Sequence, residues 1–303
     1  PDLVPRDIFI STFDTAPLAG DSAHAIAGRE AEFQAGVNVL RRLTDGFVYL
    51  GLDGRGVSAS PYASISGVEQ TYFRGPHPAG NVGTQIHHTH PVGNGENTVW
   101  TLDVNAVLVL GELFQNGRYS TERVVALSGA PLASAGYVRT HLGANLGELL
   151  KGEALDNVRV ISGDVLTGAA VGTEGYLSAF DTQVTAIEEG NEAEIFGWLL
   201  PLKARASISP TIPVLGDFEA TTNTHGERRA FVVNNDYEQV VPMDIYTQQL
   251  MKSIMINDFE GMEGLGIYEL VEEDVALAEF ACVSKQPLQS ILREGLDTMR
   301  EQS

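Results

Sequence analysis

The chain has 303 residues, of which 43% are hydrophobic, which is enough to bury a sizeable core and indicates two or three domains. Its 19 Lys and Arg against 40 Asp and Glu give a net charge of −21, so nucleic acid and anionic lipid, both polyanions, are not expected as partners. No apolar stretch approaches the roughly 18 residues of a membrane span, and a single cysteine, Cys282, excludes an intrachain disulfide and is typical of a cytosolic protein.

The first 122 residues alternate strand and helix signals, which predicts a layered α/β domain. The expected elements are strands at residues 8–10, 47–50 and 99–102, a helix at 28–44 and a second helix from 103 to 117. Asp103 is suited to cap the second helix and Gly117 to end it. The run GLDGRG at residues 51–56 does not match the spacing of a dinucleotide-binding fingerprint and is expected to be a loop.

Strand signals dominate from about Glu122 to Pro242. Strands are expected at residues 123–128, 137–142 and 158–161, with one short helix at 145–150. This pattern is typical of a small β-grasp domain. Gly190 and Asn191 then separate two alternating segments, residues 182–188 and 192–196, as in a hairpin, so residues 173–241 are expected to be mostly β.

Helical spacing returns after Pro242. Helices are expected at residues 245–256, 272–283 and 288–300. Glu272, Glu273 and Asp274 suit the first turn of the second of these helices, where the helix dipole favours negative charge.

The most unusual stretch is the loop GPHPAG from Gly75 to Gly80. Prolines fix φ and glycines remove side chains, so this loop can bring its backbone close to a ligand or to another surface. The candidate functional residues are Gly75, Pro76, His77, Pro78, Ala79, Gly80, Gly83, Thr84 and His87. The alternative is a rigid structural turn that leads into a helix.

Histidines are concentrated in the same part of the chain, since His77, His87, His88 and His90 lie close together in sequence. On a helix His87 and His90 would share one face, and imidazoles grouped in this way can bind zinc or iron. No carboxylate lies between residues 75 and 91 to complete such a site, so no metal is expected. Ser162 lacks the glycine that a nucleophile elbow has two residues before its serine, so no catalytic residue is assigned.

Nine short segments together resemble one known family, the A subunit of the sodium-pumping NADH:quinone oxidoreductase (Na+-NQR), and the match runs nearly end to end. They are residues 27–30 (AGRE), 33–36 (FQAG), 43–46 (LTDG), 75–80 (GPHPAG), 123–129 (RVVALSG), 158–163 (VRVISG), 196–198 (FGW), 221–223 (TTN) and 272–274 (EED). Each segment is short, and it is their combination and order that are specific. This family is in turn similar to the C subunit of the Rnf complex and to the flavoprotein subunit of respiratory complex I.

The resemblance implies a multidomain fold of the α/β class. The implied domains are a Rossmann-like α/β domain at residues 1–122, a β-grasp domain of the SLBB type at 123–172, a β-rich connector at 173–241 and a helical domain at 242–303. The chain begins at Pro1 without an initiator methionine, so it is expected to be a fragment that an N-terminal lipoyl-like region of the family would precede.

The resemblance also implies which cofactors to expect. Relatives in complex I and Rnf bind iron–sulfur clusters through several cysteines, whereas this chain has only Cys282, which is expected to be a buried apolar residue. The flavin-binding relatives carry a glycine-rich loop and an acidic residue after the segment that aligns with residues 78–80, and Asn81, Val82 and Gly83 stand there instead. The chain itself is therefore expected to bind no cofactor.

The function implied is that of a peripheral subunit on the cytoplasmic side of the bacterial inner membrane, held there by partner subunits. Ubiquinone is the substrate of the complex, while NADH, flavins and an iron–sulfur centre belong to other subunits, which also carry the sodium path. The chain is expected to contribute to quinone binding and assembly, and to be inactive in isolation. Two alternatives remain, a metal enzyme that uses the histidines and a flavin- and NADH-binding electron-transfer subunit.

Overall fold

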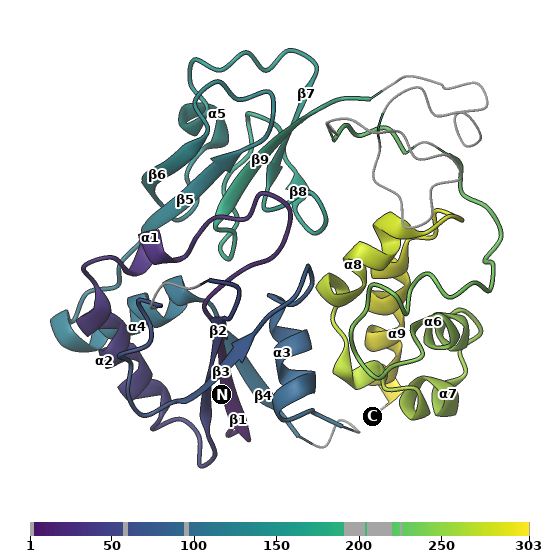
Figure 1. Ribbon diagram of the computed structural model, residues 1–303, viewed down its shortest axis with the longest axis horizontal. Coiled ribbons are helices and arrows are strands. Elements are labelled where there is room, and N and C mark those ends of the chain that lie inside the picture. The colour runs from purple at the N-terminus through teal and green to yellow at the C-terminus, as the bar shows by residue number, and fades with distance from the viewer. Residues whose placement is uncertain are drawn as a thin grey trace.

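The computed structural model describes residues 3–56, 60–93, 97–190, 204, 220–224 and 226–302. These residues form an α/β region, a β-rich region beside its upper edge and a helical region to one side (Figure 1). The predicted α/β class with several domains is confirmed. The expected strand at 192–196 and the FGW segment at 196–198 lie outside the described residues. Within the described ranges no helix is long and apolar enough to span a membrane.

The α/β region is built on a four-stranded parallel sheet. Its strands are β1 (Asp7–Ser11), β2 (Val48–Asp53), β3 (Glu69–Phe73) and β4 (Val99–Leu102), in the order β3-β2-β1-β4. The chain therefore steps outward from β1 to β3 and then returns to the other side of β1 for β4. The strand order reverses between β1 and β4, which is where open parallel sheets leave a crevice for ligands.

Four helices accompany this sheet, namely α1 (Ala23–Ile26), α2 (Glu30–Leu40), α3 (Val82–Thr89) and α4 (Val104–Asn116). The predicted caps of α4 are confirmed, because the Asp103 side chain accepts a hydrogen bond from Ala106 N at 2.6 Å and Gly117 adopts a left-handed φ of 68°. Helix α2 begins two residues later than expected, since Gly28 has a φ of 74° that a right-handed helix does not allow.

The prediction of a loop at residues 51–56 is wrong for its first three residues, which continue β2 to Asp53. The side chain of Gln85 lies against Gly51 of this strand, which leaves no room for a side chain there. A Cβ at Gly51 would stand 2.0 Å from Gln85 Oε1. Gly51 therefore makes room for a neighbouring side chain and is part of a strand, not of a phosphate-binding turn.

The β-rich region contains a five-stranded sheet. Its strands are β5 (Glu122–Ser128), β6 (Gly136–His141), β7 (Val158–Ser162), β8 (Ala169–Ala170) and β9 (Gln183–Glu188), in the order β6-β5-β9-β7-β8, and the short helix α5 (Leu146–Leu149) accompanies them. The side chain of Asn145 caps α5, accepting from Glu148 N at 3.1 Å. Strand β9 lies in the middle of this sheet, parallel to β5 and antiparallel to β7.

Strand β9 comes from the predicted connector at residues 173–241, yet it lies in the middle of the sheet formed by β5 to β8. The expectation that residues 173–241 are mostly β is wrong for the described part. Apart from β9, its described residues contribute only isolated bridges at Tyr176 and Thr221. The domain boundaries remain predictions.

The helical region follows Pro242, as predicted. It contains α6 (Thr247–Met255), α7 (Phe259–Gly264), the 3-10 turn η1 (Ile267–Glu269), α8 (Glu272–Ala281) and α9 (Leu288–Gln302). The Asp274 side chain accepts from Val271 N at 3.0 Å and so closes the first turn of α8. Helix α7 was not foreseen, because a six-residue helix is too short to show periodicity.

Each of the three regions buries a hydrophobic core of its own. Cys282 belongs to the core of the helical region and has no exposed surface, which confirms that it is buried. Its Sγ lies 2.9 Å from Tyr237 Oη and accepts from Gln286 N at 3.3 Å. The thiol is thus enclosed within the fold.

Candidate functional site

A cavity of about 550 Å³ lies at the point where the strand order reverses. Ser11 at the end of β1 and Leu102 at the end of β4 line it, together with the starts of α3 and α4. Phe180 of the β-rich region and Glu273 of α8 also contribute to its wall. The cavity is therefore shared by all three regions.

The GPHPAG loop lies beside this cavity and is fastened to the end of β1 through Thr15. Gly80 N donates to Thr15 Oγ1 at 2.8 Å, and Thr15 Oγ1 lies 3.2 Å from His77 Nδ1. Gly80 O accepts from Ser11 Oγ and from Gln85 Nε2, each at 3.2 Å. A Cβ at Gly80 would stand 2.6 Å from Thr15 N, so the close backbone approach expected of this glycine is present.

The nine candidate residues lie in three settings, namely the cavity wall, the turns of the loop and the start of α3 beside the helical region. His77 and Gly80 line the cavity, whereas the remaining loop residues form turns, in which Ala79 N donates to Pro76 O and Asn81 N donates to Pro78 O. Gly75 and the cis peptide bond at Pro78 belong to these turns.

Gly83 and His87 face the helical region instead. Gly83 lies against Asp274, and His87 Nδ1 lies 3.2 Å from Glu269 Oε2. The Oγ1 atom of Thr84, which follows Gly83, is buried without a partner among the described residues.

The histidines point to different partners and are not gathered into a metal site. His88 Nε2 donates to Pro242 O at 2.7 Å, and His90 Nδ1 lies 2.9 Å from Asp7 Oδ2. Folding brings Glu269 to the His87 ring and Asp7 to the His90 ring, although no carboxylate lies near either histidine in sequence. In the part of the chain that the structure describes, no three His, Cys, Asp or Glu residues form a group suited to hold a metal ion.

The cavity is strongly acidic. The carboxyl groups on its wall are those of Asp14, Asp21, Asp103, Asp164 and Glu273, and its described lining contains no lysine or arginine. Burial, helped by Asp274, Asp14 and Asp164, raises the pKa of Glu273 to about 7. Burial likewise raises the pKa of Asp103, and it lowers the pKa of His77 although Asp14 and Asp164 oppose that change. The His77 ring is therefore expected to be neutral near neutral pH.

A nucleotide or flavin phosphate does not fit this lining. Such groups are held by cationic side chains and by free backbone N–H groups at a helix N-terminus. The first turns of α3 and α4 both reach the cavity. Asp103 caps α4 by accepting from Ala106 N, whereas the side chain of Asn81 caps no N–H of α3, so it is the acidic wall and not the helix starts that opposes a phosphate. A phosphate would therefore enter a space surrounded by carboxyl groups, which repel it.

The loop was predictable from sequence, whereas the carboxyl groups of the cavity were not. They come from segments that are far apart in the chain, at residues 14–21, 103, 164 and 273. The sequence identified Asp103 only as a helix cap and Glu273 only as part of a first helical turn, so only the fold could show that these carboxyl groups come together.

Two family models match consecutive parts of the chain. Residues 1–119 match the NqrA second alpha/beta domain, and residues 124–172 match the NQRA C-terminal domain of the SLBB type. The two matches cover the α/β region and most of the β-rich sheet.

Relatives of similar sequence extend over nearly the whole chain. Proteins named as the A subunit of Na(+)-translocating NADH-quinone reductase are 41% identical in Shewanella frigidimarina, 38% in Rhodopirellula baltica and 39% in Vibrio alginolyticus. These matches cover 99%, 98% and 98% of this chain, and the chain spans 68%, 66% and 67% of the respective relatives. A solved NAD+-reducing [NiFe]-hydrogenase in the air-oxidized state aligns at 12% identity with a TM-score of 0.43, over 99% of this chain and 60% of that one, which is too distant to bear on the site.

Proposed function

The chain belongs to the NqrA family, the A subunits of the Na(+)-translocating NADH-quinone reductases, and on that basis we propose that it works within a membrane complex that couples electron transfer from NADH to ubiquinone with sodium export. Its own contribution is to quinone binding and to assembly, and it carries no redox cofactor. The other subunits hold NADH, flavins and the iron–sulfur centre, and they keep this chain on the cytoplasmic side of the bacterial inner membrane. The observation that carries the proposal is 41% identity over 99% of the chain.

The acidic cavity supports a chain without flavin or NADH. NADH and the flavin nucleotides FMN and FAD carry phosphate, and the cavity presents the carboxyl groups of Asp14, Asp21 and Asp164 without a cationic partner on its described lining. The flavoprotein alternative is also less consistent with the relatives, which are named as the A subunit. The fold thus supplies a ligand crevice whose chemistry differs from that of a nucleotide site.

The same cavity supports a part in quinone binding. A quinone headgroup is uncharged and planar, so carboxyl groups do not repel it as they repel a phosphate. Phe13, Tyr137 and Phe180 contribute aromatic side chains to the wall, and Phe180 is 85% exposed. Aromatic rings of this kind can pack against a planar headgroup.

Cys282 provides a prediction about electron transfer. Cys282→Ser should leave the NADH:quinone reductase activity of the complex unchanged. The thiol is enclosed by the core, and its contacts are hydrogen bonds with the Tyr237 hydroxyl and the Gln286 backbone amide, which a serine hydroxyl can replace. Cys282→Ala should also be active but should lower the free energy of unfolding by about 1–3 kcal/mol, since the Tyr237 hydroxyl loses its partner. Activity of assembled complexes and urea unfolding measure the two effects. Loss of activity in a folded and assembled Ser variant would point to a redox role for the thiol.

Co-purification tests the proposal as a whole. A tagged chain is expressed in a bacterium that makes the complex, and membranes are solubilised and captured by the tag. The remaining reductase subunits should be recovered in equal amounts with ubiquinone-1 reductase activity. Recovery of the tagged chain without them would contradict the assignment to the complex. A control tag on an unrelated cytosolic protein should recover none of them.

A further inference from the structure

The helical region is joined to the α/β region without a shared hydrophobic core. The core of the helical region draws on buried residues from Tyr237 to Met299, and none of its described members comes from the α/β region. Figure 1 shows α8 and α9 facing α3 across this junction. The hydrogen bonds across this junction come from the polar groups found there.

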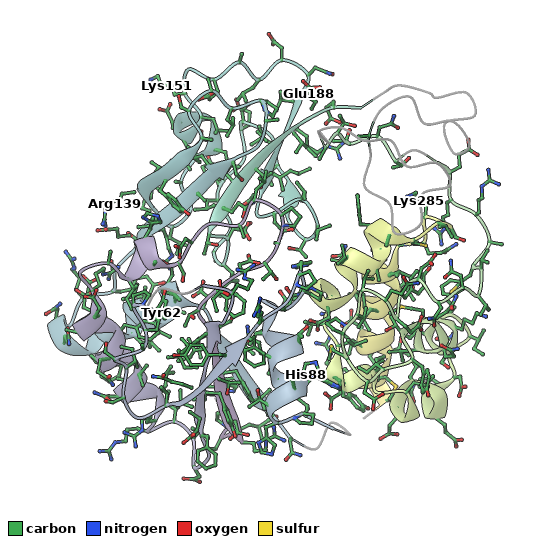
Figure 2. The ribbon with its side chains drawn as sticks, viewed as in Figure 1. Tyr62, His88, Arg139, Lys151, Glu188 and Lys285 are labelled. Carbon is green, nitrogen blue, oxygen red and sulfur yellow. The ribbon has the colours of Figure 1, made fainter. Side chains whose placement is uncertain are left out.

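These polar groups form what we call the α3 seam. On the α3 side it contains Asn81, Gly83, His87, His88 and Gly93, and on the helical side it contains Pro242, Asp244, Glu269, Glu273 and Asp274. His88, labelled in Figure 2, projects from α3 toward the helical region.

The hydrogen bonds of the seam link the two sides directly. Asn81 Nδ2 donates to Glu273 O at 3.0 Å, and Asp244 N donates to His87 Nε2 at 3.0 Å. With Nε2 acting as acceptor, the proton of the neutral His87 ring is on Nδ1, which points to Glu269 Oε2. The second Glu269 oxygen accepts from Gly93 N.

The carboxyl group of Asp274 is enclosed where α8 meets the start of α3, while that of its neighbour Glu273 is part-buried on the cavity wall. Asp274 is only 1% exposed, and its Oδ1 has no hydrogen-bond partner among the described residues. A Cβ at Gly83 would stand 2.4 Å from Asp274 Oδ2, so the carboxyl lies directly against the backbone of α3.

The charged groups that act on Glu273 are all acidic. They are Asp274 and Glu272 on α8, Asp14 after β1 and Asp164 after β7. Arg293 of α9 is engaged with Glu272, to which it donates through Nη2 at 2.7 Å. Ionised Glu273 would therefore face the carboxyl groups of Asp14 and Asp164 without a cation. Ionised Asp274 would be buried with hydrogen bonds from Val271 N and Asn81 as its only compensation among these groups, which makes its charge costly.

We propose that the α3 seam is a proton-controlled joint, which is closed while Glu273 and Asp274 are protonated and loosens when both ionise. Because Glu273 also lines the cavity, loosening the seam moves one wall of that cavity. The helical region thereby makes access to the cavity depend on pH. The joint rests on the enclosed Asp274 carboxyl and on the acidic groups around Glu273, and it would hold whatever ligand the cavity takes.

The direction of the pH effect follows from the two carboxyl groups. Burial raises the pKa of Glu273 to about 7 and that of Asp274 to about 6. Both values lie above the ordinary carboxyl range, so the closed seam binds these protons more tightly than the open one. Its advantage is complete below the ordinary carboxyl pKa, declines as the pH rises and is lost once the pH passes about 7.

The backbone amide of Gly93 reports directly on the seam, because Gly93 N donates to Glu269 Oε1 across it. Its exchange with water is measured by NMR and divided by the exchange rate of an unstructured peptide at the same pH. We expect the resulting protection to fall about tenfold or more between roughly pH 6 and pH 8. The amide of Ala278, inside α8 and buried in the core, should keep its protection.

Neutral variants locate the effect. Glu273→Gln with Asp274→Asn should retain at about pH 8 the protection that the unaltered chain has near pH 6. Glu260→Gln, which removes one exposed charge from α7, should behave like the unaltered chain. Constant protection in the unaltered chain over this range would overturn the proposal, as would an unchanged pH response in the double variant. If that variant does not fold, the profile of the unaltered chain decides alone.

Discussion

Replacing Gly80 with valine should abolish NADH:quinone reductase activity and weaken assembly of the complex. The first atom of any side chain at this position would stand 2.6 Å from Thr15 N and 2.9 Å from Thr15 Oγ1. The loop cannot move away without losing the bond from Gly80 N to Thr15 Oγ1. Forcing a branched side chain into so tight a contact typically costs about 1–3 kcal/mol and displaces the backbone. His77 would then leave its place on the cavity wall.

Gly75 provides a matched control in the same loop. A Cβ at Gly75 would meet only the Ala79 side chain, at 3.3 Å, so Gly75→Ala should assemble and retain most of its activity. Both variants are compared by recovery of the complex and by ubiquinone-1 reduction. If Gly80→Val assembles and turns over normally, the loop is no more than a structural turn.

Gly111→Ala should cause a large loss of stability, although it adds only one methyl group. Helices α2 and α4 cross with their backbones in contact, and a Cβ at Gly111 would stand 1.8 Å from Glu32 O. Gly36 of α2 has the same role, because a Cβ at Gly36 would stand 2.2 Å from Val107 O of α4. The helices must separate to admit the methyl group, which disturbs the core to which Phe33 of α2 and Val107 of α4 belong. We expect the free energy of unfolding to fall by about 3 kcal/mol or more.

The same substitution at Gly264 is the control for helix propensity. Gly264 lies in α7, and nothing stands within 4 Å of a Cβ there. Gly264→Ala should therefore change the free energy of unfolding by less than about 1 kcal/mol, in the stabilising direction. Urea unfolding followed by circular dichroism compares the two. Equal effects at both glycines would show that the backbones of α2 and α4 are not in close contact.

Elements with strong local signals could be predicted from sequence. Helix α4 has an acidic N-cap, apolar residues at helical spacing and a final glycine, and the structure places both caps as expected. Strand β3 gave no such signal, because its residues are mostly exposed and the run EQTYF has no apolar alternation. The position of β9 in the middle of its sheet depends on pairing with β5 and β7, which no local pattern records.

The candidate site was predictable only where it is local. Glycine and proline in GPHPAG indicate a special backbone, and Gly80 does approach Thr15 closely. His87 has no carboxylate near it along the chain, yet folding places Glu269 beside it across a separation of 182 residues. The seam and the acidic cavity both arise from residues that are far apart in the sequence, so neither could be predicted without the structure.

The central claim is that this chain keeps a Rossmann-like crevice but carries no redox cofactor, and the visible absorption spectrum of the chain purified under native conditions tests it most directly. We expect no absorption in the flavin or iron–sulfur region and no NADH oxidation without partner subunits, because the cavity repels phosphate and only one sequestered thiol is present. Flavin bound at about one equivalent per chain, released by denaturation and identified by its fluorescence, would contradict this claim.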